Sequence, residues 1–495
     1  MTTPPDSIAR NTAFAFAINM LSAAFTLVLT LFLVRRLGPD AYGVFALSMS
    51  VGAIVLVGSN LGISNAAARF VAESRHDRVV VQGVVSDALR LKLLVSGIFS
   101  LALAGAAGPI ASAYSTPALE RPILFLSLAV FGQSLFGFFR FLAEAEGRVS
   151  RYLRVTAVES AIETVASIAL VLVGFGASGA MAGRAWGYLT AAAFAYMLFA
   201  RNSSIGPALL ARGAGNVRRI ARYGSALLVV DGAFVLFTAI DALLIGRIID
   251  VEGVGEFQAP MKLMTFLGLM GTAAASGVAP RLTRDSGPAE ARVLDVALRR
   301  LMLLQGIFLA PLVVWATPIT SLLFGTGYES SASVLRGIAP YAFLIAISPV
   351  TAQSVTYLGE ARLRVPIATG ALAINTVFDI VMLPRIGIVA GAYGTDIAYF
   401  VYVAAHLWIC RRLIGTSVGS LGGTLARVLV AAAATGAVLL AFGTGTVGFP
   451  QLVAGGFLGS AAYVGALLLT RALTTAELRE AFAVVGGRVS RHSRA

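Results

Sequence analysis

The sequence predicts an all-α polytopic membrane protein with about fourteen spanning helices. We expect these helices to form two parallel six-helix lobes followed by two extra helices. Three observations predict this fold class. First, 58% of the 495 residues are hydrophobic and only 13% are charged, which is more apolar surface than a soluble protein can bury. Second, long apolar runs alternate with short polar hinges, and third, the chain repeats itself at an offset of 212 residues.

Each predicted span is an apolar run of about 20 residues, the length that crosses a hydrocarbon core of about 30 Å at 1.5 Å per helical residue. The first run ends at Arg35 without a small-residue cleavage site, so we expect a retained span and not a removable signal peptide. The spans are predicted near residues 11–34, 42–68, 93–113, 122–146, 152–173, 179–200, 223–246, 254–280, 301–323, 333–358, 365–383, 388–410, 424–442 and 450–470.

The basic residues predict the orientation of these spans. With the N-terminus inside, 28 of the 38 basic residues fall in cytoplasmic hinges and in the C-terminal tail, and seven fall outside. Short cytoplasmic loops carry such an excess of basic residues. The formal charge of +14 is therefore explained as an orientation signal, with both termini cytoplasmic and no nucleic-acid partner expected.

The repeat predicts how the spans are grouped. At the offset of 212 residues Gly43 corresponds to Gly255, and Glu163 corresponds to Asn375. The offset covers six spans, an even number, so both copies have the same orientation and the repeat is parallel. The predicted parts are an N-terminal lobe at 1–212, a second lobe at 213–415, helices 13 and 14 at 416–471, and a basic cytoplasmic tail at 472–495.

The sequence argues against an enzyme. The glycine-rich segments 174–179 and 443–448 have the spacing of a phosphate loop, but each joins two spans and is interpreted as a tight turn. One cysteine, Cys410, excludes a disulfide framework, and three scattered histidines give no metal-ligand spacing. We expect no catalytic residue, metal or cofactor, and an ion gradient, the membrane potential, the substrate gradient or a separate partner as the energy source.

Ionisable side chains inside spans are the main functional signal, because each one requires a partner or a wet cavity. Four carboxyl groups are predicted to couple transport to H+ or Na+. Glu163 lies one helical turn after Glu159, so one of this pair is expected to hold a proton unless an arginine intervenes. The alternative for each carboxyl group is an ion pair or a contact between helices. The predicted ion-coupling residues are Asp231, Asp241, Glu163 and Asp379.

Cationic and amide side chains in the spans are predicted to bind the substrate. Lys262 is one of two lysines in the chain and shares a helix face with Gln258. Two alternatives stay open, namely that Lys262 pairs with an aspartate of the seventh span and that Arg140 is neutralised by Glu144. The predicted substrate-binding residues are Lys262, Arg140, Gln258, Asn60, Asn65 and Asn375.

Three stretches carry a resemblance to a known family. They are Leu-Val-Arg-Arg-Leu-Gly-Pro-Asp-Ala-Tyr-Gly at 33–43, Asn-Leu-Gly-Ile-Ser-Asn at 60–65, and the run from Asn375 to Gly387. In these stretches the chain resembles the polysaccharide or O-antigen flippases (Wzx-like) of the MOP superfamily, which have a MATE-like fold. The resemblance covers nearly the whole chain and identifies the family better than the substrate.

The resemblance implies a flippase that moves an undecaprenyl-diphosphate-linked oligosaccharide across the cytoplasmic membrane of a bacterium by alternating access. The product would serve cell-surface polysaccharide or lipopolysaccharide biosynthesis, and glycan-assembly proteins would be the partners beside the lipid bilayer. One alternative is a MATE-type multidrug/cation antiporter, although that group usually has twelve helices. The other is a non-transporting membrane scaffold of a glycan-assembly complex.

Overall fold

The computed structural model describes residues 8–74, 76–146, 149–202, 215–278, 282, 288–445 and 447–479. Helices are the only regular secondary structure across these ranges, so the predicted all-α class is confirmed. The described residues divide into two compact units. Unit 1 contains residues 1–259, 323–328 and 368–391, and unit 2 contains residues 260–322, 329–367 and 392–495.

Unit 1 begins with α1 (Ile8–Asn60), which is kinked at Gly38 where the backbone is left-handed (φ 74°). The kink separates two arms, each long enough to be one predicted span. The remaining helices that lie wholly in unit 1 are α2 (Ile63–Glu73), α3 (Arg78–Gly105), α4 (Ala107–Ala113), η1 (Pro117–Leu119), α5 (Glu120–Ala145), α6 (Val149–Leu172), α7 (Gly176–Asn202) and α8 (Val217–Ile248).

Unit 2 holds the later helices. Two helices are divided between the units: α9 (Val251–Val278) enters unit 2 at Pro260, and α15 (Arg364–Ile386) leaves it at 368. The other helices of unit 2 are α10 (Pro288–Gln305), η4 (Gly306–Phe308), α11 (Leu309–Val314), α12 (Ala316–Phe324, up to Leu322), α13 (Glu329–Gly337), α14 (Ala339–Tyr357), η5 (Ala361–Leu363), α16 (Val389–Ile414, from Ala392), α17 (Val418–Ala441) and α18 (Phe449–Leu469).

The core of unit 1 forms where α2, α3, α5, α6, α7 and α8 bring large apolar side chains together. Phe138, Phe139 and Phe199 are nearly fully buried in it, and the rings of Phe139 and Phe199 lie 5.6 Å apart. This packing fixes the positions of the polar side chains on the same helices.

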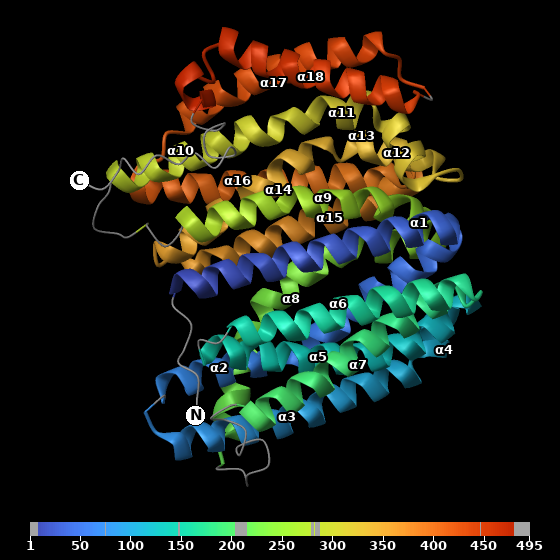
Figure 1. Cartoon of the computed structure of the whole chain (residues 1–495), viewed down its shortest axis with the longest axis vertical. Helices are drawn as coiled ribbons and strands as arrows, with labels where there is room; N and C mark the ends of the chain where they lie inside the picture. The colour runs from blue at the N-terminus through green and yellow to red at the C-terminus, as the bar shows by residue number, and fades with distance from the viewer. Residues whose placement is uncertain are drawn as a thin grey trace. The chain divides into compact units, whose positions relative to one another are not determined.

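The pair α17 and α18 lies side by side in unit 2, next to α10 and α11 (Figure 1). Trp315 is buried at this contact, and its indole nitrogen donates to the carbonyl oxygens of Leu439 (3.3 Å) and Gly443 (3.1 Å). The hydroxyl of Tyr463 donates to the carbonyl of Leu303 at 2.8 Å. Beyond α18, Glu477 binds Arg299 at 2.7 Å, and this hydrogen bond lowers the pKa of Glu477 to about 2.

Ten helices in the described part of the chain are long and apolar enough to cross a membrane, or eleven if the bent pair α13 and α14 forms one span. This establishes a multi-pass membrane protein. Each of the fourteen predicted spans overlaps a helix, but the count of fourteen stays a prediction, as does the division at 212 and 415.

Two predicted hinges are wrong. The third span was expected to begin at 93, whereas α3 already begins at Arg78. The ninth was expected to begin at 301, whereas α10 begins at Pro288. In both cases basic residues at the start of an amphipathic helix were interpreted as a loop. The correction matters most for Lys92, which lies inside α3 and not in a hinge.

Candidate functional site

An acidic cluster lies between α8 and α15 inside unit 1. Asp241 is 3% exposed, and Asn375 and Asp379 are fully buried. The side-chain amide of Asn375 donates to Asp241, and the carboxyl group of Asp379 lies beside that of Asp241. Neither oxygen of Asp379 receives a hydrogen bond from the described residues. Two carboxyl groups this close in a low dielectric cannot both be ionised at low cost, so the cluster requires a proton or a bound cation.

The structure thus brings together two of the predicted ion-coupling residues. Asp241 and Asp379 lie more than 130 positions apart in the sequence. Asn375, which we expected at the substrate, belongs to the same cluster. The fourth predicted acid of this region, Asp231, lies on α8, but its side chain is outside the described residues.

A second buried cluster joins α6 and α7. The guanidinium of Arg184 binds Glu163 at 2.6 Å and donates to the hydroxyl of Tyr188 at 3.2 Å. Glu159, one turn before Glu163, receives a hydrogen bond from Ser160 at 2.9 Å. An arginine therefore does intervene beside the two glutamates, as one branch of the prediction allowed. Glu163 is neutralised within the protein, which leaves one excess carboxyl group at Glu159.

The predicted substrate-binding residues do not gather at one place. Arg140 pairs with Glu144 at 3.0 Å on an exposed face of α5, where both side chains are over two-fifths exposed. Gln258 is buried on α9 within unit 1, whereas Lys262, one turn further along α9, is half-buried in unit 2. Asn60 and Asn65 are half-buried on either side of a break between α1 and α2.

Lys92 is the functional candidate that sequence reasoning missed. Its side chain is fully buried in α3, and its ammonium donates to the side-chain oxygen of Asn60. The available signal was its rarity, because the chain has only one other lysine, Lys262, among 38 basic residues. The charge pattern hid this signal, since a cation at the end of a basic hinge looks like a loop residue.

A close contact joins the start of the second arm of α1 to the start of α9. A Cβ atom on Gly43 would lie 1.9 Å from the carbonyl oxygen of Val251, and one on Gly255 would lie 2.1 Å from that of Pro39. Both positions require glycine, because no side chain fits. Pro39 and Val251 are also 212 residues apart, so the contact is nearly symmetric between the two copies of the repeat.

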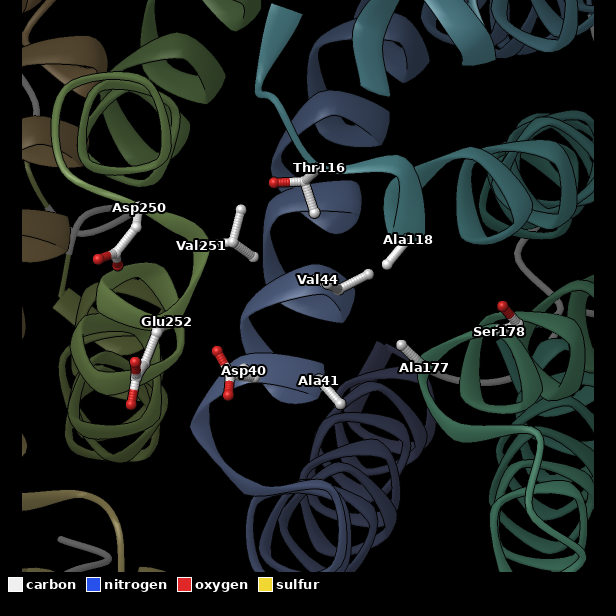
Figure 2. Close-up of a pocket in the computed structure, with 10 residues that line it drawn as sticks. All are labelled: Asp40, Ala41, Val44, Thr116, Ala118, Ala177, Ser178, Asp250, Val251 and Glu252. Atoms are coloured by element: carbon white, nitrogen blue, oxygen red, sulfur yellow. The ribbon is translucent and has the colours of Figure 1, made fainter. Parts of the chain in front are cut away.

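A pocket of about 620 Å³ lies beside this glycine contact. Asp250 and Glu252 reach it from the connection between α8 and α9, whereas Asp40 comes from α1 and Ser178 from α7 (Figure 2). Carboxyl and hydroxyl groups line it together with apolar side chains, and no cation is among the lining residues. Such a lining repels phosphate groups, so this pocket is not a diphosphate site.

Residues 32–333 match the family described as Polysaccharide biosynthesis protein. A curated relative, an uncharacterised membrane protein of Methanocaldococcus jannaschii, is 17% identical over 203 residues. That match spans only 40% of this chain and 40% of the relative.

Solved structures of flippases and transporters share the fold. The lipid II flippase MurJ in an inward closed conformation has a TM-score of 0.76 at 13% identity, covering 93% of this chain and 99% of that structure. An inward-facing multidrug resistance MATE family transporter of the MOP superfamily has a TM-score of 0.65 at 16% identity, covering 81% and 96%. These likenesses establish the fold. Because the family match covers well over half of the sequence, the chain belongs to the polysaccharide biosynthesis protein family and has the fold of the MOP superfamily.

Proposed function

We propose that this protein is a flippase that moves a lipid-linked oligosaccharide, carried on undecaprenyl diphosphate, across the cytoplasmic membrane of a bacterium. The observation that carries the proposal is the family match over residues 32–333. The translocated glycan would enter cell-surface polysaccharide or lipopolysaccharide biosynthesis, with glycan-assembly proteins as partners. Both termini lie in the cytoplasm, in keeping with the excess of basic residues in the predicted inner hinges.

Alternating access by two repeated lobes, 1–212 and 213–415, is the proposed mechanism. The nearly symmetric contact of Gly43 and Gly255 supports it, because equivalent positions of the two copies meet there. With the N-terminus inside, this contact lies at the outer side of the membrane. It closes the outer side in one state and separates in the other.

Ion coupling is assigned to the cluster of Asp241, Asn375 and Asp379. A proton or Na+ bound there removes the repulsion between the two carboxyl groups, and its release restores that repulsion. A gradient of that cation would supply the energy. Asp231 remains a candidate on the same helix as Asp241.

The substrate head group is assigned to polar side chains of α9 and of the second span. Lys262 suits a phosphate because a lysine offers charge on a flexible stem, and Gln258 suits a sugar hydroxyl. Asn60 and Asn65 are the other amide candidates. Arg140 is the weakest of the predicted set, since Glu144 already neutralises it on an exposed face.

Flipping in reconstituted vesicles tests the proposal. Purified protein is placed in vesicles with a labelled undecaprenyl-diphosphate oligosaccharide, and a membrane-impermeant glycosidase reports which leaflet holds it. We expect the protein to accelerate crossing, and a proton or Na+ gradient to accelerate it further. Crossing no faster than in protein-free vesicles would contradict the flippase. Export of organic cations by the same vesicles would favour the MATE-type antiporter.

The glycine contact provides a test of the mechanism. Gly43→Ala places a methyl group against the carbonyl of Val251, so the outer contact cannot close and the outer side stays open. A cysteine introduced as Thr116→Cys in the neighbouring pocket reports opening through an impermeant maleimide, because the native Cys410 is buried. Gly97→Ala is the matched control, since nothing lies within 4 Å of its Cβ position. Equal labelling of the two variants would refute the gate.

A further inference from the structure

The second predicted span is interrupted in its middle. α1 ends at Asn60, and α2 begins again at Ile63. The two residues between them are both left-handed, Leu61 with φ 40° and Gly62 with φ 61°. The equivalent stretch of the second copy, 272–276, lies within the uninterrupted helix α9. The break is therefore a feature of the first copy alone.

The helix α8 holds this break in place from one side. A Cβ atom on Gly62 would lie 2.4 Å from the carbonyl oxygen of Gly224, and one on Gly224 would lie 2.2 Å from that of Leu61. Backbone therefore packs directly against backbone. The left-handed turn is a fixed part of the packing, and in transporters such interrupted spans form ion and substrate sites.

A buried cation lies next to the break. The ammonium of Lys92 has three hydrogens to donate, and Asn60 at the end of α1 is the acceptor recorded for it. Among the described residues no carboxylate pairs with Lys92, in contrast to Arg184 on α7. The equivalent position of the second copy is the apolar Leu304. A buried ammonium without an anion is costly in a spanning segment.

The other side of the break offers further donors. Ser64 is 5% exposed, and its hydroxyl has no hydrogen-bond partner in the described part of the chain. It lies in the first turn of α2, where side chains lean towards the helix N-terminus. The ladder of α2 begins with the amide of Ala66, which donates to Gly62, so the amides before it have no acceptor within the helix. The N-terminal end of this eleven-residue helix also carries a partial positive charge.

We propose that the break between α1 and α2 binds a small inorganic anion, held by the ammonium of Lys92, the hydroxyl of Ser64 and the first amides of α2. The anion supplies the missing negative charge and accepts from donors that have no other acceptor. Chloride has the appropriate size, because Lys92 is wholly enclosed and a glycan diphosphate cannot follow. The site does not depend on which substrate the protein carries.

Thermal unfolding of the full-length protein in zwitterionic nanodiscs tests the site. Unfolding is measured with increasing chloride against gluconate at constant ionic strength, so that only specific binding contributes. We expect chloride to raise the midpoint along a saturable curve, as a ligand of the folded state does. A wild-type midpoint that does not respond to chloride would overturn the proposal.

Variants assign the effect to the break. Lys92→Met should abolish the chloride dependence, and Lys262→Met, which changes the other lysine, should keep it. Ser64→Ala should weaken chloride binding about tenfold, the cost of one hydrogen bond to a charged group. Ser48→Ala is the matched control, because that buried hydroxyl already donates to Val44. Chloride dependence that survives in Lys92→Met would refute the assignment.

A direct measurement covers the case in which Lys92→Met does not fold. A crystal grown in bromide should show anomalous scattering between Lys92 and the start of α2, and Lys92→Arg should keep that signal. Bromide found only elsewhere would overturn the site. Stabilisation by undecaprenyl diphosphate but not by chloride would refute the assignment to a small anion.

Discussion

Two buried acidic clusters differ in one group, the guanidinium of Arg184. On α6 and α7, Glu163 lies 2.6 Å from that guanidinium, so the positive charge is part of the protein. On α8 and α15, Asp241 and Asp379 have the amide of Asn375 beside them and no basic partner recorded in the described residues. Glu163 and Asn375 occupy equivalent positions of the repeat, so the two sites are two versions of one location.

The difference shows how a repeat can separate structural from exchangeable charge. A built-in guanidinium holds its position permanently and stabilises two helices. A cluster that lacks one must obtain its positive charge from outside, and it can release that charge again. The second arrangement suits coupling, and the first suits permanent packing.

The largest expected effect comes from removing the internal cation. Arg184→Met leaves Glu163 buried without a partner and should destabilise the protein by about 3–5 kcal/mol. Unfolding in mixed micelles measures this loss. The double variant Arg184→Met with Glu163→Gln should recover most of it. If the single variant is as stable as the wild type, the guanidinium does not stabilise this cluster.

The acidic cluster should respond in the opposite way. Asp379→Asn removes the carboxyl repulsion, so stability should stay equal or rise, while gradient-driven flipping should fall about 10–100-fold, equivalent to 1.4–2.8 kcal/mol. Vesicle flipping with and without a cation gradient, together with unfolding of the same protein, measures both quantities.

Thr424→Val is a control for this experiment, because it removes a buried polar group of α17 outside both clusters. We expect it to keep the response to the gradient. If Asp379→Asn also keeps the full response, the cation is bound elsewhere.

A partly exposed pair gives an intermediate case. The hydrogen bond from Arg299 lowers the pKa of Glu477 from 4.5 to about 2. The stabilising contribution, about 1 kcal/mol at most, is therefore present above pH 4.5 and disappears as the pH falls through 2. Thermal unfolding between pH 6 and 2 should show a loss that is absent in Glu477→Gln. Parallel curves for both proteins would argue against this contact.

The smallest effect is expected for the exposed pair of Arg140 and Glu144. Arg140→Gln should change stability by only about 0.3–0.5 kcal/mol, because solvent screens an exposed pair one turn apart. Flipping should be unchanged if Arg140 has no contact with the substrate. A large loss of flipping at normal stability would restore Arg140 as a substrate-binding residue.

The sequence predicted the acidic cluster residue by residue, because an ionisable group in an apolar run is conspicuous without any knowledge of packing. It could not predict that Asp241 and Asp379 are neighbours, since that contact depends on how α8 packs against α15. The pairing of Arg184 with Glu163 has the same origin. The glycine contact shows the limit clearly: the repeat identified Gly43 and Gly255 as equivalent, but only the packing of the helices brings them together.

Lys92 illustrates a different kind of failure. The rule that basic residues belong to cytoplasmic hinges is a statistical rule about many cations, and it misplaced this one. The hinge was drawn up to residue 92, whereas α3 begins fourteen residues earlier. A fully buried ammonium is identified by its burial, which only the folded chain reveals.

The environment of Trp315 gives the protein its own spectroscopic reporter. Trp315 is 4% exposed against the end of α17, whereas the other two tryptophans, Trp186 and Trp408, are 65% and 59% exposed. Brominated lipids quench the fluorescence of tryptophans they can touch, so the unquenched remainder should come mainly from Trp315. Its emission maximum would then follow the docking of α17 and α18 in an intact membrane, without any added label.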